Sequence, residues 1–282
     1  MKRTSALVML VIGAFVLHAA TADANSAGIS GRSKAGCGGG GCHGTAPSSD
    51  TSVTLTAPGT IAPGGSTPIT VTVTSAVPIG GINQGGFNLS STAGQFTALT
   101  GTQAFSAVEV GHATSGNNQR SWTVNWSPAG LCEFDLFAAS NAVDGDGLQT
   151  SADHWNLATA SVALAATADA APPATPVFNR PIAGSVYLAG SRTAQGLPLT
   201  LVIGGPIVVE VTALDNVGID HVKVTDVVND TSTDLPAATY NANTKRFTTS
   251  WNPVTPGQHT LTAESVDCNG NASQATFSAF VL

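Results

Sequence analysis

Two cysteines and a histidine near the N-terminus form the cluster whose residue types and spacing point to a specific chemistry. Four glycines separate Cys37 from Cys42, and His43 follows directly. Covalent haem attachment needs two thiols that add to the vinyl groups and a histidine immediately after the second thiol, usually as Cys-x-x-Cys-His. Because glycine tolerates strained loop conformations, the two additional residues can bulge while both sulfurs reach one porphyrin. The pattern predicts one covalent haem c, with His43 as the proximal axial ligand of the iron.

Two other interpretations of the same residues stay open. In an oxidising compartment, Cys37 and Cys42 can form a disulfide across the glycine loop, with no role for His43. A zinc or copper site is the third interpretation, with three local ligands and no second Cys/His pair close in sequence. The disulfide interpretation would make the chain a structural or adhesive protein.

The distal haem ligand is not a methionine of this chain, because both methionines lie in a leader that we expect to be removed. We expect His112 as the distal axial ligand, with His154 as the second candidate and an open or partner-supplied position as the alternative. His221 and His259 are expected to have no chemical role. Ligation by two histidines leaves no open coordination position, so such a haem would transfer electrons.

Residues 1–24 have the layout of a secretory signal peptide. Lys2 and Arg3 precede an apolar run over residues 6–17, which is too short to span a bilayer comfortably, and small residues lead to Ala24. We expect cleavage after Ala24 and no membrane span in the mature chain. The product would be secreted, periplasmic or displayed on the cell surface.

The charge and the missing motifs exclude several function classes. The formal net charge is -7, and charged residues make up 10% of the chain. A sparsely charged acidic surface argues against nucleic acid and anionic lipid as partners. Since the sequence also shows no phosphate loop and no Ser-His-Asp set in recognisable context, we predict no enzymatic activity. The expected partners are redox proteins or neighbouring copies in an assembly.

Alternation with a period of two residues predicts an all-β fold that positions these groups. The segments 69–74 and 121–126, for example, alternate Ile, Val or Trp with Thr, Ser or Asn. One apolar and one polar face is typical of a strand that covers a core on one side. Short strands separated by turn residues favour immunoglobulin-like β-sandwiches.

The mature chain divides into four expected parts. Residues 25–50 are the Gly-rich segment with the haem motif, and residues 51–166 form a first sandwich. Residues 167–176 are an Ala/Pro-rich linker, and residues 177–282 form a second sandwich. The fold class is therefore two sandwiches in tandem after the haem-motif segment.

Two further features leave alternatives open. Acidic and amide side chains surround an Asp-Gly-Asp-Gly loop and would suit Ca²⁺, or would form a plain acidic turn: Asn141, Asp144, Asp146 and Asp153. Cys132 falls on the apolar face of its strand and is expected to be a buried thiol, although a bridge to Cys268 would join the two sandwiches.

Several segments resemble a known family in order along the chain: GISGRSKAGCGGGGCHG, IAPGGSTPITVTV, GGFNLSSTAGQF, GHATSGNNQRSWTVNWSPAG and AASNAVDGDGLQTSAD. From Gly28 to about Leu164 the chain resembles secreted Reeler-like, choice-of-anchor V domain proteins. The resemblance implies a sandwich preceded by a Gly-rich stretch with a cytochrome-type Cys-x-x-Cys-His-Gly signature. This chain departs from the family in its cysteine spacing and in ending with a second sandwich.

The segments VEVTALDNVGIDHVKV and GQHTLTAESVDCNGNAS resemble the bacterial Ig-like domains of cell-surface proteins, over most of residues 177–282. The resemblance rests on a turn from Asp215 to Gly218 and on a corner containing Asp267, Gly270 and Asn271. It implies a spacer, stalk or adhesion unit, since the fold alone does not give a function. We therefore predict an exported monohaem c-type protein that transfers electrons, or alternatively a structural or adhesive surface protein with a Cys37–Cys42 disulfide.

Overall fold

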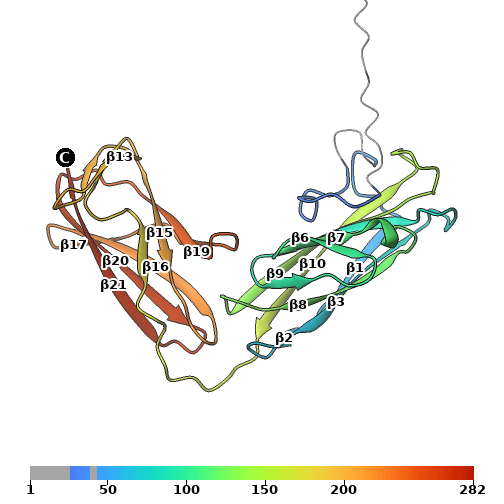
Figure 1. Cartoon of the computed structure of the whole chain (residues 1–282), viewed down its shortest axis with the longest axis horizontal. Helices are drawn as coiled ribbons and strands as arrows, with labels where there is room; N and C mark the ends of the chain where they lie inside the picture. The colour runs from blue at the N-terminus through green and yellow to red at the C-terminus, as the bar shows by residue number, and fades with distance from the viewer. Residues whose placement is uncertain (1–25, 39–42) are drawn as a thin grey trace, which may run out of the picture.

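Two all-β sandwiches follow one another along the chain and are joined by a strand-free segment over residues 165–176 (Figure 1). The structure, a computed structural model, describes residues 26–38 and 43–282. Within these residues no helix is long and apolar enough to cross a bilayer. The expected fold class, tandem β-sandwiches, is confirmed.

The first sandwich packs a four-stranded sheet, in the order β1-β3-β8-β5, against a six-stranded sheet, in the order β2-β10-β9-β4-β7-β6. A single 3₁₀ turn, Thr114–Gly116, precedes β8. The strands are β1 (Thr51–Thr56), β2 (Thr60–Ile61), β3 (Thr67–Ser75), β4 (Gly85–Ser91), β5 (Gln95–Thr97), β6 (Thr102–Ser106), β7 (Glu109–His112), β8 (Ser121–Ser127), β9 (Glu133–Ala142) and β10 (His154–Leu164).

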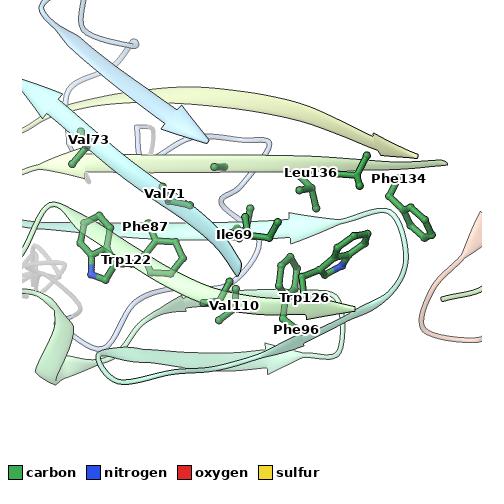
Figure 2. Close-up of a cluster of buried hydrophobic side chains, with 14 of the residues drawn as sticks. Ile69, Val71, Val73, Phe87, Phe96, Val110, Trp122, Trp126, Phe134 and Leu136 are labelled. Atoms are coloured by element: carbon green, nitrogen blue, oxygen red, sulfur yellow. The ribbon is translucent and has the colours of Figure 1, made fainter. Parts of the chain in front are cut away.

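The core between these sheets follows the predicted alternation. Strands β3 and β8 bury every second side chain, including Trp122 and Trp126, which are 2% and 0% exposed (Figure 2). On the outer face, hydroxyl pairs such as Thr70 and Thr123, 2.9 Å apart, face solvent. Alternation thus separates an apolar core from a polar surface at each step along the strand.

The alternation fails where strands β4 and β9 are covered on both faces. Residues Gly85–Leu89 and Ala138–Ala142 are all buried. The outer cover at β4 is the N-terminal segment, because the backbone N–H groups of Arg32 and Ser33 donate to Oδ1 of Asn88 at 3.0 and 2.6 Å. The break in the pattern therefore marks the place where residues 26–38 lie on the sandwich.

The second sandwich packs sheets in the orders β11-β15-β19-β18 and β13-β12-β14-β21-β20-β16-β17. Its core surrounds Trp251, whose indole N–H donates to Asp226 at 2.8 Å. The strands are β11 (Val177–Arg180), β12 (Ser185–Leu188), β13 (Ser191–Gln195), β14 (Leu201–Ile203), β15 (Ile207–Thr212), β16 (Ile219–Val228), β17 (Thr231–Asp234), β18 (Thr239–Asn241), β19 (Arg246–Trp251), β20 (Gly257–Asp267) and β21 (Ala272–Val281).

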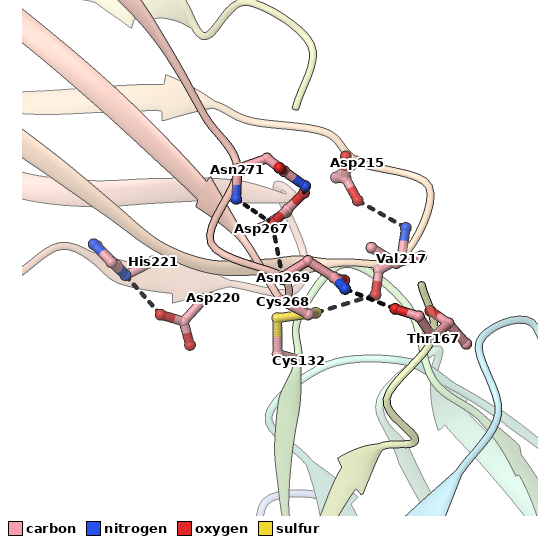
Figure 3. Close-up of a disulfide and its surroundings, with 10 residues drawn as sticks. All are labelled: Cys132, Thr167, Asp215, Val217, Asp220, His221, Asp267, Cys268, Asn269 and Asn271. Carbon is pink, nitrogen blue, oxygen red and sulfur yellow. Dashed lines mark hydrogen bonds and ion pairs between the residues drawn. A yellow bond between two sulfur atoms is a disulfide. The ribbon is translucent and has the colours of Figure 1, made fainter. Parts of the chain in front are cut away.

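A disulfide between Cys132 and Cys268 joins the two sandwiches (Figure 3). The expectation that Cys132 is a buried thiol is wrong, because its strand begins at the edge of the first core, where the side chain is half-buried and reaches the second sandwich. Beside it, Leu131 forms a parallel bridge with Ile219, and Leu131 packs against both cores. The interdomain bridge that the sequence left open is therefore the state of these cysteines.

Candidate functional site

The N-terminal segment is held on the first sandwich by close backbone approach to one tryptophan. A Cβ atom at Gly36 would lie 2.0 Å from Cζ3 of Trp155, and one at Gly38 would lie 2.6 Å from its Cζ2. The indole N–H of Trp155 in turn donates to the carbonyl of Gly44 at 3.1 Å. Glycine is required here because no side chain fits between the backbone and the ring.

His43 is fixed through both ring nitrogens. Nδ1 lies 2.8 Å from Oδ2 of Asp153, and Nε2 lies 3.0 Å from the amide nitrogen of Asn141. An amide nitrogen only donates and a carboxylate only accepts, so the contacts specify a neutral ring with its proton on Nδ1. The side chain of Asp153 is fully buried and that of His43 is 14% exposed. This tautomer presents the Nε2 lone pair, which is the form that ligates a metal.

Asp153 also shapes the loop before β10. Its Oδ1 accepts from the N–H of Asp144 at 3.2 Å, and its Oδ2 accepts from that of Thr150 at 3.3 Å. Asp144 and Asp146 accept backbone N–H groups two residues ahead of them. These are the contacts of an acidic turn, and Ca²⁺ binding at this loop stays a prediction.

His112, the last residue of β7, is half-buried beside β4. Its Nδ1 lies 3.1 Å from the N–H nitrogen and 3.3 Å from the carbonyl oxygen of Phe87. A Cβ atom at Gly86 would lie 2.5 Å from the imidazole, so glycine makes room for the ring. If Nδ1 accepts from the N–H of Phe87, a neutral ring carries its proton on Nε2. If Nδ1 instead donates to the carbonyl oxygen of Phe87, a neutral ring leaves Nε2 unprotonated.

One pocket collects the predicted site residues. Cys37, His43 and His112 all line it, together with Phe87 and Asn141, and it encloses about 110 Å³. This volume lies below the range of about 300–1,000 Å³ that is usual for small-molecule and cofactor sites, so a ligand as large as a haem would extend out of the open mouth. Cys42, the fourth predicted residue, lies outside the described residues. Three groups from residues 37, 43 and 112 therefore meet in one place, as a shared ligand requires.

The other histidines are elsewhere. Nδ1 of His154 lies 2.8 Å from the carboxylate of Asp50, and that of His221 lies 2.7 Å from Asp220. His259 is 1% exposed and contacts Asp226. The lining of the pocket includes none of the three.

Sequence reasoning missed the residues that support His43. The sequence predicted Asp153 and Asn141 only as candidate calcium ligands and predicted no role for Trp155. Residues 110 and 98 positions away from His43 make these contacts. One sequence segment, AASNAVDGDGLQTSAD, contains both Asn141 and Asp153. The pairing of β9 with β10 then places Trp155 opposite Asn141.

The haem expectation can be tested against this geometry. The lining offers one of the two thiols that covalent attachment needs and both imidazoles that two-histidine ligation needs. The Nδ1 contact of His43 is the usual support of a metal-bound histidine. Its Nε2 contacts Asn141, so the amide would have to yield this position to iron. The donor set fits the group, which would extend beyond the enclosed part of the pocket into its open mouth.

Comparison with known proteins concerns mainly the second sandwich. A family model for a bacterial Ig domain matches residues 199–263, which confirms the Ig-like expectation there. No curated protein matches the chain. The resemblance of residues 28–164 to Reeler-like proteins stays a prediction.

Solved structures with similar folds include an engineered protein, with 19% identity over 43% of this chain and 21% of that chain (TM-score 0.28). Fibronectin(III)-like modules of Clostridium thermocellum CbhA show 17% identity over 82% of this chain and 94% of theirs (TM-score 0.27). A putative membrane anchored protein from Corynebacterium diphtheriae shows 15% identity over 82% of this chain and 53% of its own (TM-score 0.26). The chain thus spans about a fifth of the first protein and about half of the third.

Proposed function

We propose that this chain is an exported protein that holds one haem c in the pocket of its first sandwich and transfers electrons there. The observation that carries the proposal is the convergence of Cys37, His43 and His112 on one pocket. The disulfide between Cys132 and Cys268 supports export, because such bonds persist mainly in oxidising compartments.

Each residue has a distinct role in this proposal. Cys37 and Cys42 would attach the porphyrin, and His43 and His112 would ligate the iron. A bound haem supplies one-electron redox chemistry. Asp153 accepts a hydrogen bond from the Nδ1–H group of His43, which fixes the ring and raises its basicity as a ligand. The glycine contacts with Trp155 keep the attachment segment against the sandwich.

A structural or adhesive role is the second candidate, and the second sandwich favours it. The bacterial Ig domain match covers residues 199–263, and the interdomain disulfide fixes this sandwich to the first. In this case Cys37 and Cys42 would be bridged to each other and the pocket would bind no haem. A stalk or spacer role for the second sandwich is compatible with either function of the first.

The deciding experiment is a pyridine haemochrome spectrum with intact mass, on the full chain exported from a host with haem-attachment machinery. We expect a c-type spectrum and the mass of one added haem, both lost in Cys37→Ala plus Cys42→Ala. His112→Ala should change the low-spin spectrum, whereas His154→Ala, the control, should leave it unchanged. A colourless protein whose mass shows only disulfides would overturn the proposal and leave the structural role.

A further inference from the structure

A cation lines the pocket of the first sandwich. Apart from the histidines, the charged side chains among the described residues of the lining are Arg32, from the N-terminal segment, and Asp146, from the exposed loop before β10. The chain as a whole is acidic, with 10 Lys and Arg residues against 17 Asp and Glu residues. A guanidinium at a ligand site is suited to a carboxylate, because its fork of N–H groups matches the two oxygens.

The backbone that carries Arg32 is fixed on the outer face of the sheet. The N–H groups of Arg32 and Ser33 donate to Oδ1 of Asn88, at 3.0 and 2.6 Å. The N–H of Gly31 donates to the carboxylate of Glu109. Side chains of β4 and β7 thus place Arg32 at the pocket in advance, which lowers the entropy cost of binding a ligand there.

The guanidinium of Arg32 has no partner in the described part of the chain. Among the ion pairs found over residues 26–38 and 43–282, none involves this residue, although Glu109 binds the backbone beside it. A ligand that fills the pocket removes water from the guanidinium. A cation that loses water without gaining an anion costs considerable free energy, so the ligand has to supply the anion.

A second donor in the same lining is unsatisfied. Asn88 is 2% exposed and its Oδ1 accepts two backbone N–H groups, so the orientation of the amide is fixed and Nδ2 is the donor side. Nδ2 exposes less than 1 Å² and donates no hydrogen bond. A native fold normally provides a partner for such a group, and a ligand that does so has to displace the atoms that now cover it. This observation is independent of the charge of Arg32, and both call for an acceptor at one side of the pocket.

We propose that Arg32, together with the amide of Asn88, binds a propionate carboxylate of the haem; this inference rests on the proposed function. The propionates are the anionic groups of a haem, and the rest of its edge is largely apolar. The guanidinium offers paired N–H groups to the carboxylate oxygens, and Asn88 adds a neutral donor. Apolar lining residues, such as Phe87 and Val143, suit the remainder of the macrocycle.

The charge of Arg32 should raise the reduction potential of the haem. A cation beside a propionate offsets negative charge that otherwise favours the oxidised iron. Arg32→Gln removes the charge and should lower the potential, whereas Arg32→Lys should retain most of it. Spectroelectrochemical titration of the haem-loaded full chain measures both. Lys34→Gln removes a cation of the same segment that lies over Phe137, outside the lining of the pocket. It is the matched control and should leave the potential nearly unchanged.

A second measurement separates contact with the propionate from a general effect of charge. Infrared difference spectra between the oxidised and reduced protein, with ¹³C at the propionate carboxyl carbons, report the carboxylate bands directly. We expect these bands to shift in Arg32→Gln and in Asn88→Asp but not in Lys34→Gln. Asn88→Asp keeps the acceptor for the N–H groups of Arg32 and Ser33 and removes the donor, so it leaves the support of the segment in place.

The outcomes distinguish this inference from the proposed function. A chain that carries no haem in any variant overturns both. Haem-loaded Arg32→Gln with the potential and the labelled bands of Lys34→Gln overturns the inference alone. A lowered potential with unchanged labelled bands also overturns it, because Arg32 then acts through its charge without contacting the propionate. If Arg32→Gln alone fails to take up haem, the labelled bands of Arg32→Lys and Asn88→Asp decide in the same way.

Discussion

The buried carboxylate of Asp153 lies 2.8 Å from Nδ1 of His43, although 110 residues separate the two in the sequence. The contact fixes the tautomer and the orientation of the imidazole. The first sandwich therefore determines the position of His43 through this side-chain pair, and Trp155 holds the neighbouring Gly44 through its indole N–H.

The proposed haem protein therefore has a positioning residue in Asp153. Asp153→Asn replaces the anionic acceptor with a neutral amide, so His43 becomes a weaker electron donor to iron and the reduction potential should rise. Spectroelectrochemical titration of the haem-loaded protein measures this. Asp144→Asn, in the same loop but outside the lining of the pocket, is the matched control and should leave the potential unchanged. Equal shifts in both variants would assign the effect to the loop rather than to the His43 contact.

Substitution of two glycines in the N-terminal segment distinguishes the cost of backbone strain from the cost of a steric clash. Gly36 and Gly31 have φ of +81° and +75°, so alanine costs about 1–2 kcal/mol at either position. At Gly36 the new methyl would also meet Trp155, whereas at Gly31 nothing lies within 4 Å. Overpacking adds roughly 1–3 kcal/mol.

Gly36→Ala should therefore release the segment, with faster amide exchange over residues 26–38 and altered Trp155 fluorescence. Gly31→Ala should show the smaller effect on exchange and no change in fluorescence. A similar response of both variants would mean that the tryptophan contact does not hold the segment.

The sequence predicted the parts of this molecule that depend on local pattern. Alternation in segments such as 69–74 predicted which side chains form the core, and the adjacent cysteine and histidine predicted a place for a ligand. The side chains that hold His43 and its segment in position depend on strand pairing, which brings Asn141 of β9 opposite Trp155 of β10. Alternation gives the face of a residue but not its neighbour on the next strand, so the Asp153 contact could not be derived.

The same limit explains the cysteine bridge. The apolar alternation predicted that Cys132 lies on the core face. In the structure, Cys132 directly precedes β9, at the end of the first sandwich that meets the second. Removing the disulfide with Cys132→Ala plus Cys268→Ala should uncouple the unfolding of the two sandwiches. The bond closes a loop with a sequence separation of 136, so the cost is at most about 5 kcal/mol.

Differential scanning calorimetry should then show two separate transitions in the double variant and a lower melting temperature. The Cys37→Ala plus Cys42→Ala protein is the control, and a reductant should reproduce the uncoupling in it. Identical scans with and without the bridge would show that noncovalent contacts, such as the packing of Leu131 and Tyr240 against both cores, couple the sandwiches.

Asp267 should make the second sandwich sensitive to acid. Burial alone would raise its pKa, but the side chain of Asn271 and the backbone N–H groups of Asn269, Asn271 and Gly270 stabilise the ionised form, so the pKa of Asp267 lies below its ordinary range. Because the folded pKa is the lower one, this contribution to stability is present above the ordinary aspartate pKa of about 3.9. It is lost as the pH falls through the folded value.

Denaturant unfolding from pH 7 down to pH 2 measures the effect. Asp267→Asn should lower the unfolding free energy by about 1–3 kcal/mol at pH 7, since the corner loses its charged acceptor. The difference from the unchanged chain should shrink as the pH falls, because protonation removes the same charge from the natural residue. Asp230→Asn, on the surface, should show no such convergence. A constant difference between Asp267→Asn and the unchanged chain across this range would mean that shape, rather than charge, makes Asp267 stabilising.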